Sequence, residues 1–242
     1  MRLCITSLLM ALIATVAAAP VRADVTFSDG TFNNADWQVS MLFQSYNGGS
    51  VTGSQVAAGG NPGTYRSINT SVNPLAAGTP YSNVLGFNQR LGDTYDPSSQ
   101  GAIGSLDFSI DFLNINVFGN GQGFELALSQ NGSLFGLLPH NTLTVGGWQH
   151  FSLTGVTAND FYQITSAPPI YMFDGTHHPD FSSSGAPISV GFYTATATTD
   201  VPFTLTAGYD NWSVTAHTVP EPSTFLLLAL GALASLATRW SR

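Results

Sequence analysis

The stretch SLDFSIDF, residues 105–112, alternates polar and apolar residues over eight positions without a break. Successive side chains of a β-strand point to opposite faces, so this pattern predicts a strand with one buried and one wet face. Shorter alternation recurs at residues 37–43, 124–128, 188–192 and 212–214. No comparable stretch repeats at helical spacing.

Turn-forming clusters separate these segments. Gly and Asn, which accept a positive φ, gather at residues 47–50, 59–63, 131–133 and 182–185. Many short strands with frequent turns indicate an all-β protein, an antiparallel β-sandwich with jelly-roll connections. The segment 57–79, rich in Gly, Ser, Asn and Pro, is expected to form a long loop.

The amino terminus has the layout of a secretory signal peptide, with a positive start, an apolar run and small residues at its end. We place the cleavage after Ala23, because a cut after Ala19 would put Pro20 directly beyond the scissile bond, where it suits a peptidase poorly. Residues 1–23 are therefore a predicted signal peptide, and export through the Sec translocon is expected. The only cysteine, Cys4, leaves with this segment, so the exported chain can form no disulfide.

Residues 24–218 form the predicted sandwich domain, a length that suits one hydrophobic core. The domain has two arginines, no lysine and thirteen carboxylic acids, so its formal charge is −11. Nucleic acid is excluded as a partner, because phosphate binding needs clustered Lys and Arg.

The carboxyl end carries an uncharged run, residues 224–238, dominated by Leu and Ala. As a helix it would span roughly 23 Å, less than a typical ~30 Å hydrocarbon core, so we expect a short transmembrane helix. The alternative is a buried core helix, which fits less well because the run is apolar all round and ends in charge. Arginines follow the run and favour the cytoplasmic side, which leaves the domain on the far side of the membrane.

Three features follow one another at this end of the chain. The first is a Pro-Glu-Pro triplet (Pro220, Glu221 and Pro222), the second is the apolar run, and the third is an arginine cluster (Arg239 and Arg242). Residues 219–242 thereby resemble the PEP-CTERM sorting signal of Gram-negative bacteria that make exopolysaccharide. The resemblance implies that a membrane enzyme, exosortase, cleaves near Pro-Glu-Pro. The helix would then be a transient membrane anchor, and the domain would reach the cell surface or the extracellular matrix.

Three short runs resemble secreted bacterial sandwiches of the concanavalin A-like and carbohydrate-binding jelly-roll type: residues 59–63 (GGNPG), 148–153 (WQHFSL) and 208–214 (GYDNWSV). Domains of this type often tie the first strand to the last through calcium. Acid-rich turns offer the hard oxygen ligands that calcium prefers, and Asp29 and Asp210 are the candidate ligands for such a structural ion. No other cofactor is expected.

Sugar sites usually combine an aromatic platform with Asn or Asp side chains. Four consecutive residues contain these parts and are the candidate ligand-binding residues: Tyr209, Asp210, Asn211 and Trp212. Alternation along this run puts part of the set in the core, and Trp212 is the strongest candidate for a core anchor.

No catalytic residue is assigned. A glycosidase needs two carboxylates across the scissile bond, and Glu125, the only glutamate of the domain, is expected on a solvent-facing strand position. Asp107 and Asp111 share the wet face of the strand at 105–112, where solvated charges are the ordinary interpretation. The run His177-His178-Pro179-Asp180 is interpreted as a loop without metal, because neighbouring side chains of an extended chain diverge.

These observations favour a non-enzymatic surface or matrix protein that binds, or is built into, extracellular polysaccharide after processing by exosortase. The alternative is a secreted glycan hydrolase or lyase on the same scaffold. A third class, a structural coat or adhesion protein without a ligand pocket, differs from the first by lacking glycan affinity.

Overall fold

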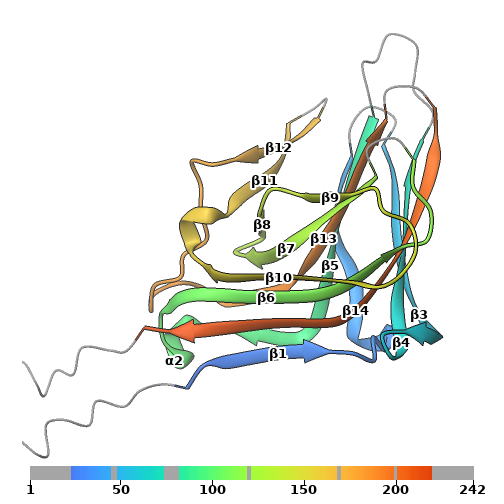
Figure 1. The fold of residues 1–242 in the computed structure, drawn as a ribbon. Helices are drawn as coiled ribbons and strands as arrows, with labels where there is room; N and C mark the ends of the chain where they lie inside the picture. Colours follow the sequence, from blue (N-terminus) through green and yellow to red (C-terminus); the bar gives the residue numbers. More distant parts are fainter. Residues whose placement is uncertain are drawn as a thin grey trace, which may run out of the picture.

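A computed structural model describes residues 23–44, 48–73, 82–118, 121–167, 170–198 and 201–219. Two antiparallel sheets make up this part of the chain (Figure 1). Sheet A has the order β10-β6-β14-β4-β3, with β1 also paired to β14. Its strands are β1 (Val25–Asp29), β3 (Gly49–Gly60), β4 (Gly63–Val72), β6 (Ile103–Asn114), β10 (Gln149–Val156) and β14 (Phe203–Thr218).

Sheet B has the order β12-β11-β8-β7-β13-β5-β2, with β9 also paired to β7. Its strands are β2 (Trp37–Gln44), β5 (Ser82–Tyr95), β7 (Gln122–Gln130), β8 (Ser133–Gly136), β9 (His140–Thr142), β11 (Tyr162–Ala167), β12 (Ile170–Asp174) and β13 (Ile188–Thr198). The described helices are single turns: η1 (Asn34–Asp36), α2 (Pro97–Gln100) and η2 (Ala158–Asp160).

The chain passes repeatedly from one sheet to the other, at β1 to β2, β2 to β3, β4 to β5, β5 to β6, β6 to β7, β9 to β10, β10 to β11 and β13 to β14. The predicted all-β antiparallel sandwich is therefore confirmed. Each alternating stretch lies within a strand, and residues 105–112 lie within β6. The predicted transmembrane helix at 224–238 and residues 1–22 of the predicted signal peptide lie outside the described residues. Among the residues that are described, no helix is long and apolar enough to cross a membrane.

The main hydrophobic core lies between the sheets. It is filled by the apolar faces of β6, β7, β13 and β14, with Trp37 and Trp212 in T-shaped contact at 5.1 Å between ring centroids. A smaller cluster covers the second face of sheet B and includes Phe87, Tyr193 and Ile164. Strands β11 and β12 contribute to this cluster and also contact β2, so sheet B curls over its own face.

The expected long loop at 57–79 is wrong for its described part, which belongs to the β3–β4 hairpin. Residues 63–72 are rich in Ser, Thr and Asn, but β4 pairs with β14 and turns four side chains inward: Arg66, Ile68, Thr70 and Val72. The hairpin turn at Asn61-Pro62 contains a cis peptide bond and lies close to β14 and β6.

Candidate functional site

The turn between β3 and β4 is pinned to the outer face of sheet A, the face turned away from sheet B. The backbone N–H of Asn61 donates to Asp210 Oδ2 at 2.6 Å, and its side-chain Nδ2 donates to Asp111 Oδ2 at 3.0 Å. Asp111 and Asp210 occupy paired positions on β6 and β14. The turn therefore caps two neighbouring carboxylates, and Asp111 is 5% exposed instead of being solvated as predicted.

Asn211 completes this cluster from β14. Its φ of 48° is left-handed, and the register between β14 and β6 shifts at this point, as in a β-bulge. Its Nδ2 donates to the carbonyl oxygen of Asn61 at 2.6 Å and to Asp111 Oδ2 at 2.7 Å. The bulge thus aims an exposed amide side chain at the hairpin turn.

The structure separates the four candidate ligand-binding residues. Tyr209 and Trp212 are each 1% exposed in the main core, and Asp210 is fully buried beneath the turn. Only Asn211 is exposed. The predicted role of Trp212 as a core anchor agrees with this burial.

The two carboxylates have opposite pKa shifts. Burial raises the pKa of Asp210, and the neighbouring charge of Asp111 raises it further. The backbone N–H groups of Asn61 and Asn211 donate to Asp210 and offset only part of this rise. Burial alone would also raise the pKa of Asp111, but hydrogen bonds from Asn211, His150 and Asn61 lower it below its usual value. His150 Nδ1 lies 2.6 Å from Asp111 Oδ1, and the His150 side chain is 63% exposed. Asp111 is therefore the more acidic of the two carboxylates.

An aromatic pair lies beside the cluster. The rings of Tyr65 and Trp148 meet edge to face at 5.5 Å, and both residues are half-buried. Trp148 Nε1 donates to the carbonyl oxygen of Gly59 at 3.0 Å. The pair lies over Gly208 of β14, where a Cβ atom would come within 3.0 Å of both rings. Gly208 thus makes room for an aromatic platform on the sheet.

The runs at 59–63, 148–153 and 208–214, distant in sequence, therefore meet at one place. We define the outer-face site as Asn61, Tyr65, Asp111, Trp148, His150 and Asn211. Sequence reasoning singled out Asn211 but missed Tyr65, which lay in an expected loop, and treated Trp148 only as part of a resemblance.

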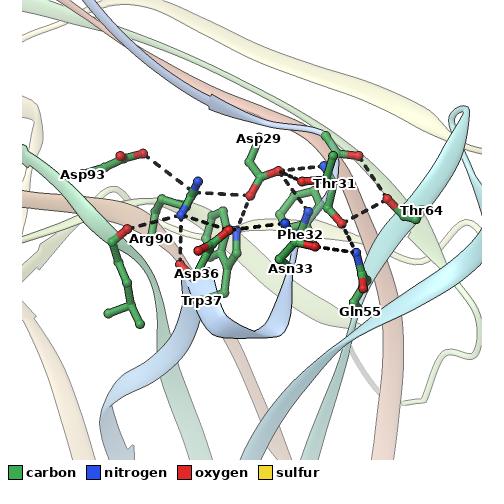
Figure 2. Close-up of polar contacts among 12 residues, drawn as sticks. Asp29, Thr31, Phe32, Asn33, Asp36, Trp37, Gln55, Thr64, Arg90 and Asp93 are labelled. Carbon is green, nitrogen blue, oxygen red and sulfur yellow. Dashed lines mark hydrogen bonds and ion pairs between the residues drawn. The ribbon is translucent and has the colours of Figure 1, made fainter.

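Asp29 anchors the neighbouring turn, as Figure 2 shows. Its Oδ1 accepts from the backbone N–H groups of Thr31 and Phe32 at 2.7 and 2.9 Å, and its Oδ2 accepts from Trp37 Nε1 at 2.8 Å. Burial raises the pKa of Asp29, but these donors outweigh it and lower the value. Arg90 Nε lies 3.3 Å from Asp29 Oδ2.

Arg90 is surrounded by carboxylates. Besides Asp29, its Nη1 lies 3.7 Å from Asp36 Oδ2 and its Nε lies 3.7 Å from Asp93 Oδ2 (Figure 2). Burial raises the pKa of Asp93, although the charge of Arg90 lowers it in part. An open pocket of about 510 Å³ adjoins this cluster and reaches Asn211 of the outer-face site. Its other lining residues are Ser28, Asp29, Gly30, Thr31, Arg90, Trp212 and Ser213.

The calcium hypothesis fits these groups poorly. The carboxylate oxygens of Asp29 and Asp210 accept N–H donors, which point where a cation would have to lie. In the described part of the chain, no three His, Cys, Asp or Glu side chains are grouped to hold a metal. His177 pairs with Asp174 at 2.8 Å, whereas His178 Nδ1 lies 2.8 Å from the carbonyl oxygen of Phe161.

Glu125 differs from the expectation. It points away from the main core, as the alternation of β7 requires, but it is 4% exposed because the curl of sheet B covers that face. Burial raises its pKa to about 7, against one hydrogen bond from the backbone N–H of Leu126. The residue paired with it on β13 is Tyr193, not a second carboxylate. The predicted solvent-facing position is therefore wrong.

Residues 218–242 match the family model of the PEP-CTERM protein-sorting motif. The match confirms the sorting signal and implies that the protein is exported, held at the membrane during sorting and processed by exosortase. No curated protein sequence matches the chain.

Several solved structures resemble the fold. A family 11 carbohydrate-binding module of a cellulosomal cellulase of Clostridium thermocellum has 12% identity and a TM-score of 0.43, over 82% of this chain and 99% of the module. A protein of unknown function from Shewanella oneidensis has 14% identity and a TM-score of 0.41, over 88% of this chain and 95% of its own. At these identities and TM-scores the likeness assigns no ligand.

Proposed function

We propose that the exported domain is a non-enzymatic polysaccharide-binding protein and that it binds a neutral glycan at the outer-face site. The observation that supports this is the half-buried Tyr65–Trp148 pair beside the amides of Asn61 and Asn211. Apolar faces of sugar rings pack against aromatic side chains, and a few placed polar groups orient the hydroxyls. The pocket next to Asn211 extends the same face and offers further hydroxyl groups from Ser28, Thr31 and Ser213.

The charges of the domain favour a ligand without acid groups. The described residues contain two basic side chains that are permanently charged. Arg66 is 1% exposed in the core, and Arg90 is held among three carboxylates. Uronic acid, sulfate or phosphate groups would therefore meet the ionised Asp111 with no free arginine or lysine to pair with.

Delivery follows from the sorting signal. In this proposal the Sec translocon exports the chain, the carboxyl-terminal helix holds it in the inner membrane, and exosortase releases the domain to the cell surface or extracellular matrix. Polysaccharide binding then retains the released domain in the matrix.

Binding of purified residues 24–219 to soluble neutral, uronate-containing and amino-sugar polysaccharides tests the proposal, with isothermal titration calorimetry as the readout. We expect neutral glycans to bind, and Trp148→Ala to weaken binding at least tenfold. The matched control is Phe118→Ala, an exposed aromatic residue outside the site, 45% exposed. Lack of binding to every glycan, or equal loss in both variants, would count against the site.

One observation favours a rival enzyme function: a buried carboxyl with a pKa of about 7 suits a general acid. Turnover of a polysaccharide by the purified domain, abolished by Glu125→Gln, would establish the hydrolase or lyase instead.

A further inference from the structure

Both ends of the domain lie at the same pole of the sandwich. Strand β1, which begins two residues after Ala23, pairs with the last part of β14 in the register Val25↔Ala216 and Thr26↔Thr215 (Figure 1). The described residues next to the two predicted cleavage points, Ala23 and Val219, therefore lie at the same end of the domain.

The carboxyl-terminal residues of the domain are fixed by backbone hydrogen bonds up to the last described position. Thr218 pairs with Ile103 of β6, and the N–H of Val219 donates to the carbonyl oxygen of Ala102 at 2.9 Å. The N–H of Thr218 also donates to Asp24 Oδ1 at 3.2 Å. Strand β14 pairs with β1 up to Ala216 and with β6 up to Thr218, so its last residues stay paired on the β6 side.

His217 adds a side-chain clamp at this end. Its Nδ1 lies 2.7 Å from Asp24 Oδ2 and its Nε2 lies 3.0 Å from Asp107 Oδ2. Asp107 also accepts from the backbone N–H of Gly155 at 2.8 Å. Hydrogen bonds that His217 donates to Asp107 and Asp24 raise its pKa, so the clamp favours the protonated imidazole. It links β1, β6 and β14 at the root of the sorting signal.

The spacing leaves little room for a processing enzyme. The sorting-motif match starts at residue 218, so its first two residues belong to the sandwich. Four residues, 220–223, separate Val219 from the apolar run. Fully extended they reach about 14 Å, of which the headgroup layer takes roughly 5–8 Å. The folded domain must therefore lie almost against the membrane while the tail is attached.

We propose that processing of the tail requires residues 217–219 to separate from β6 and from Asp24, and that the clamp around His217 limits how fast this happens. A protease binds several substrate residues in extended form, and residues paired within a sheet are unavailable until they open locally. The domain thus delays its own release until the end of β14 opens.

The test follows processing of the full-length chain in cells that contain exosortase, by pulse-chase and mass spectrometry of the product. We expect His217→Ala to speed processing about two- to tenfold, the range set by partly exposed ion pairs. His177→Ala is the matched control, because His177 forms an exposed pair with Asp174 at 2.8 Å and is distant from the chain ends in sequence. This control should process at the wild-type rate.

A second variant leaves the domain sequence unchanged: six Gly and Ser residues inserted between Val219 and Pro220. The spacer should speed processing and abolish the difference between His217→Ala and wild type. Equal rates for His217→Ala, His177→Ala and wild type without the spacer would overturn the proposal. An unchanged wild-type rate with the spacer would overturn it as well. Neither result depends on glycan binding.

Discussion

Asp111 and Asp210 occupy directly paired positions on β6 and β14, and a turn 149 residues from Asp210 in sequence holds both carboxylates. Two like charges side by side under a hairpin would repel each other. Asn61 and Asn211 offset this repulsion, since each donates to both carboxylates through its backbone or side-chain nitrogen. The position of the hairpin therefore depends on these two amides.

Removing either amide side chain should loosen the hairpin. Asn61→Ala deletes one hydrogen bond to an ionised carboxylate, and we expect the free energy of unfolding to fall by about 1.5–3 kcal/mol. Asn33→Ala is the control, since its side-chain contacts with Asp36 and Gln55 are both exposed and are 3.5 and 3.3 Å long, and it should change stability by less than about 0.5 kcal/mol. Urea denaturation followed by tryptophan fluorescence measures both. Equal values would show that the turn does not depend on Asn61.

The aromatic platform should respond to a single added methyl group. In Gly208→Ala the new Cβ would lie 3.0 Å from the rings of Tyr65 and Trp148, so the pair must shift by a few tenths of an ångström. Near-ultraviolet circular dichroism should change, and affinity for the neutral glycan should drop about three- to tenfold. Gly63→Ala is unsuitable as a control because φ there is 92°. Thr206→Ala, also on β14, is expected to retain the wild-type spectrum.

Glu125 gives the protein a predictable pH dependence. Burial raises its pKa to about 7 in the folded protein, against an ordinary value of 4.5, so the folded state holds a proton that the unfolded state has released. Stability therefore falls as pH rises from about 4.5 to 7 and levels off above 7, by at most about 3 kcal/mol. Glu125→Gln should remove this slope and melt at a higher temperature than wild type at pH 8. A slope that persists in the variant would assign it to other groups.

The sequence predicted the strands whose two faces differ. Residues 105–112 alternate because the odd positions face outward from sheet A while Leu106, Phe108 and Ile110 fill the core. Strand β4 was not predicted because two of its buried residues, Arg66 and Thr70, are polar. Its inward-facing positions therefore show no alternation of apolar residues in the sequence. Local alternation also placed Glu125 on the correct side of β7.

Long-range contacts explain what the sequence could not reveal. Whether the outer side of β7 is wet depends on the curl of β11 and β12, which no local pattern encodes. The outer-face site likewise depends on contacts between residues 50 to 150 positions apart, such as Asn61 with Asp111 and with Asn211. Trp148, a large aromatic residue with Gly, Gln and His as its sequence neighbours, was the one signal that could have indicated it.

The turn at Asp29 should be sensitive to loss of its charge. Asp29→Asn keeps one acceptor for Thr31 and Phe32 but leaves Arg90 and Trp37 Nε1 with poorer partners, so we expect a loss of about 2–4 kcal/mol. Asp93→Asn is the control, because it lies 3.7 Å from Arg90 and its pKa is already raised by burial. Calcium and chelator should leave both melting temperatures unchanged, whereas a chelator-dependent drop in wild type would restore the calcium hypothesis.

The two arginines of the domain should respond in opposite directions to the same substitution. Arg66 is 1% exposed, its Nε and Nη1 have no hydrogen-bond partner within the described chain, and burial lowers its pKa to about 10 despite the charge of Asp29. Its guanidinium carbon lies 5.6 Å from the Trp37 ring centroid, a cation–π contact that offsets only part of the desolvation.

Arg66→Met keeps the length of the side chain and removes the charge, so it should raise stability by about 1 kcal/mol or more. Arg90→Met should lower stability, because three carboxylates would lose their shared cation. If thermal denaturation shows both variants destabilised to the same extent, Arg66 is as well paired as Arg90 and its burial is not a cost to the fold.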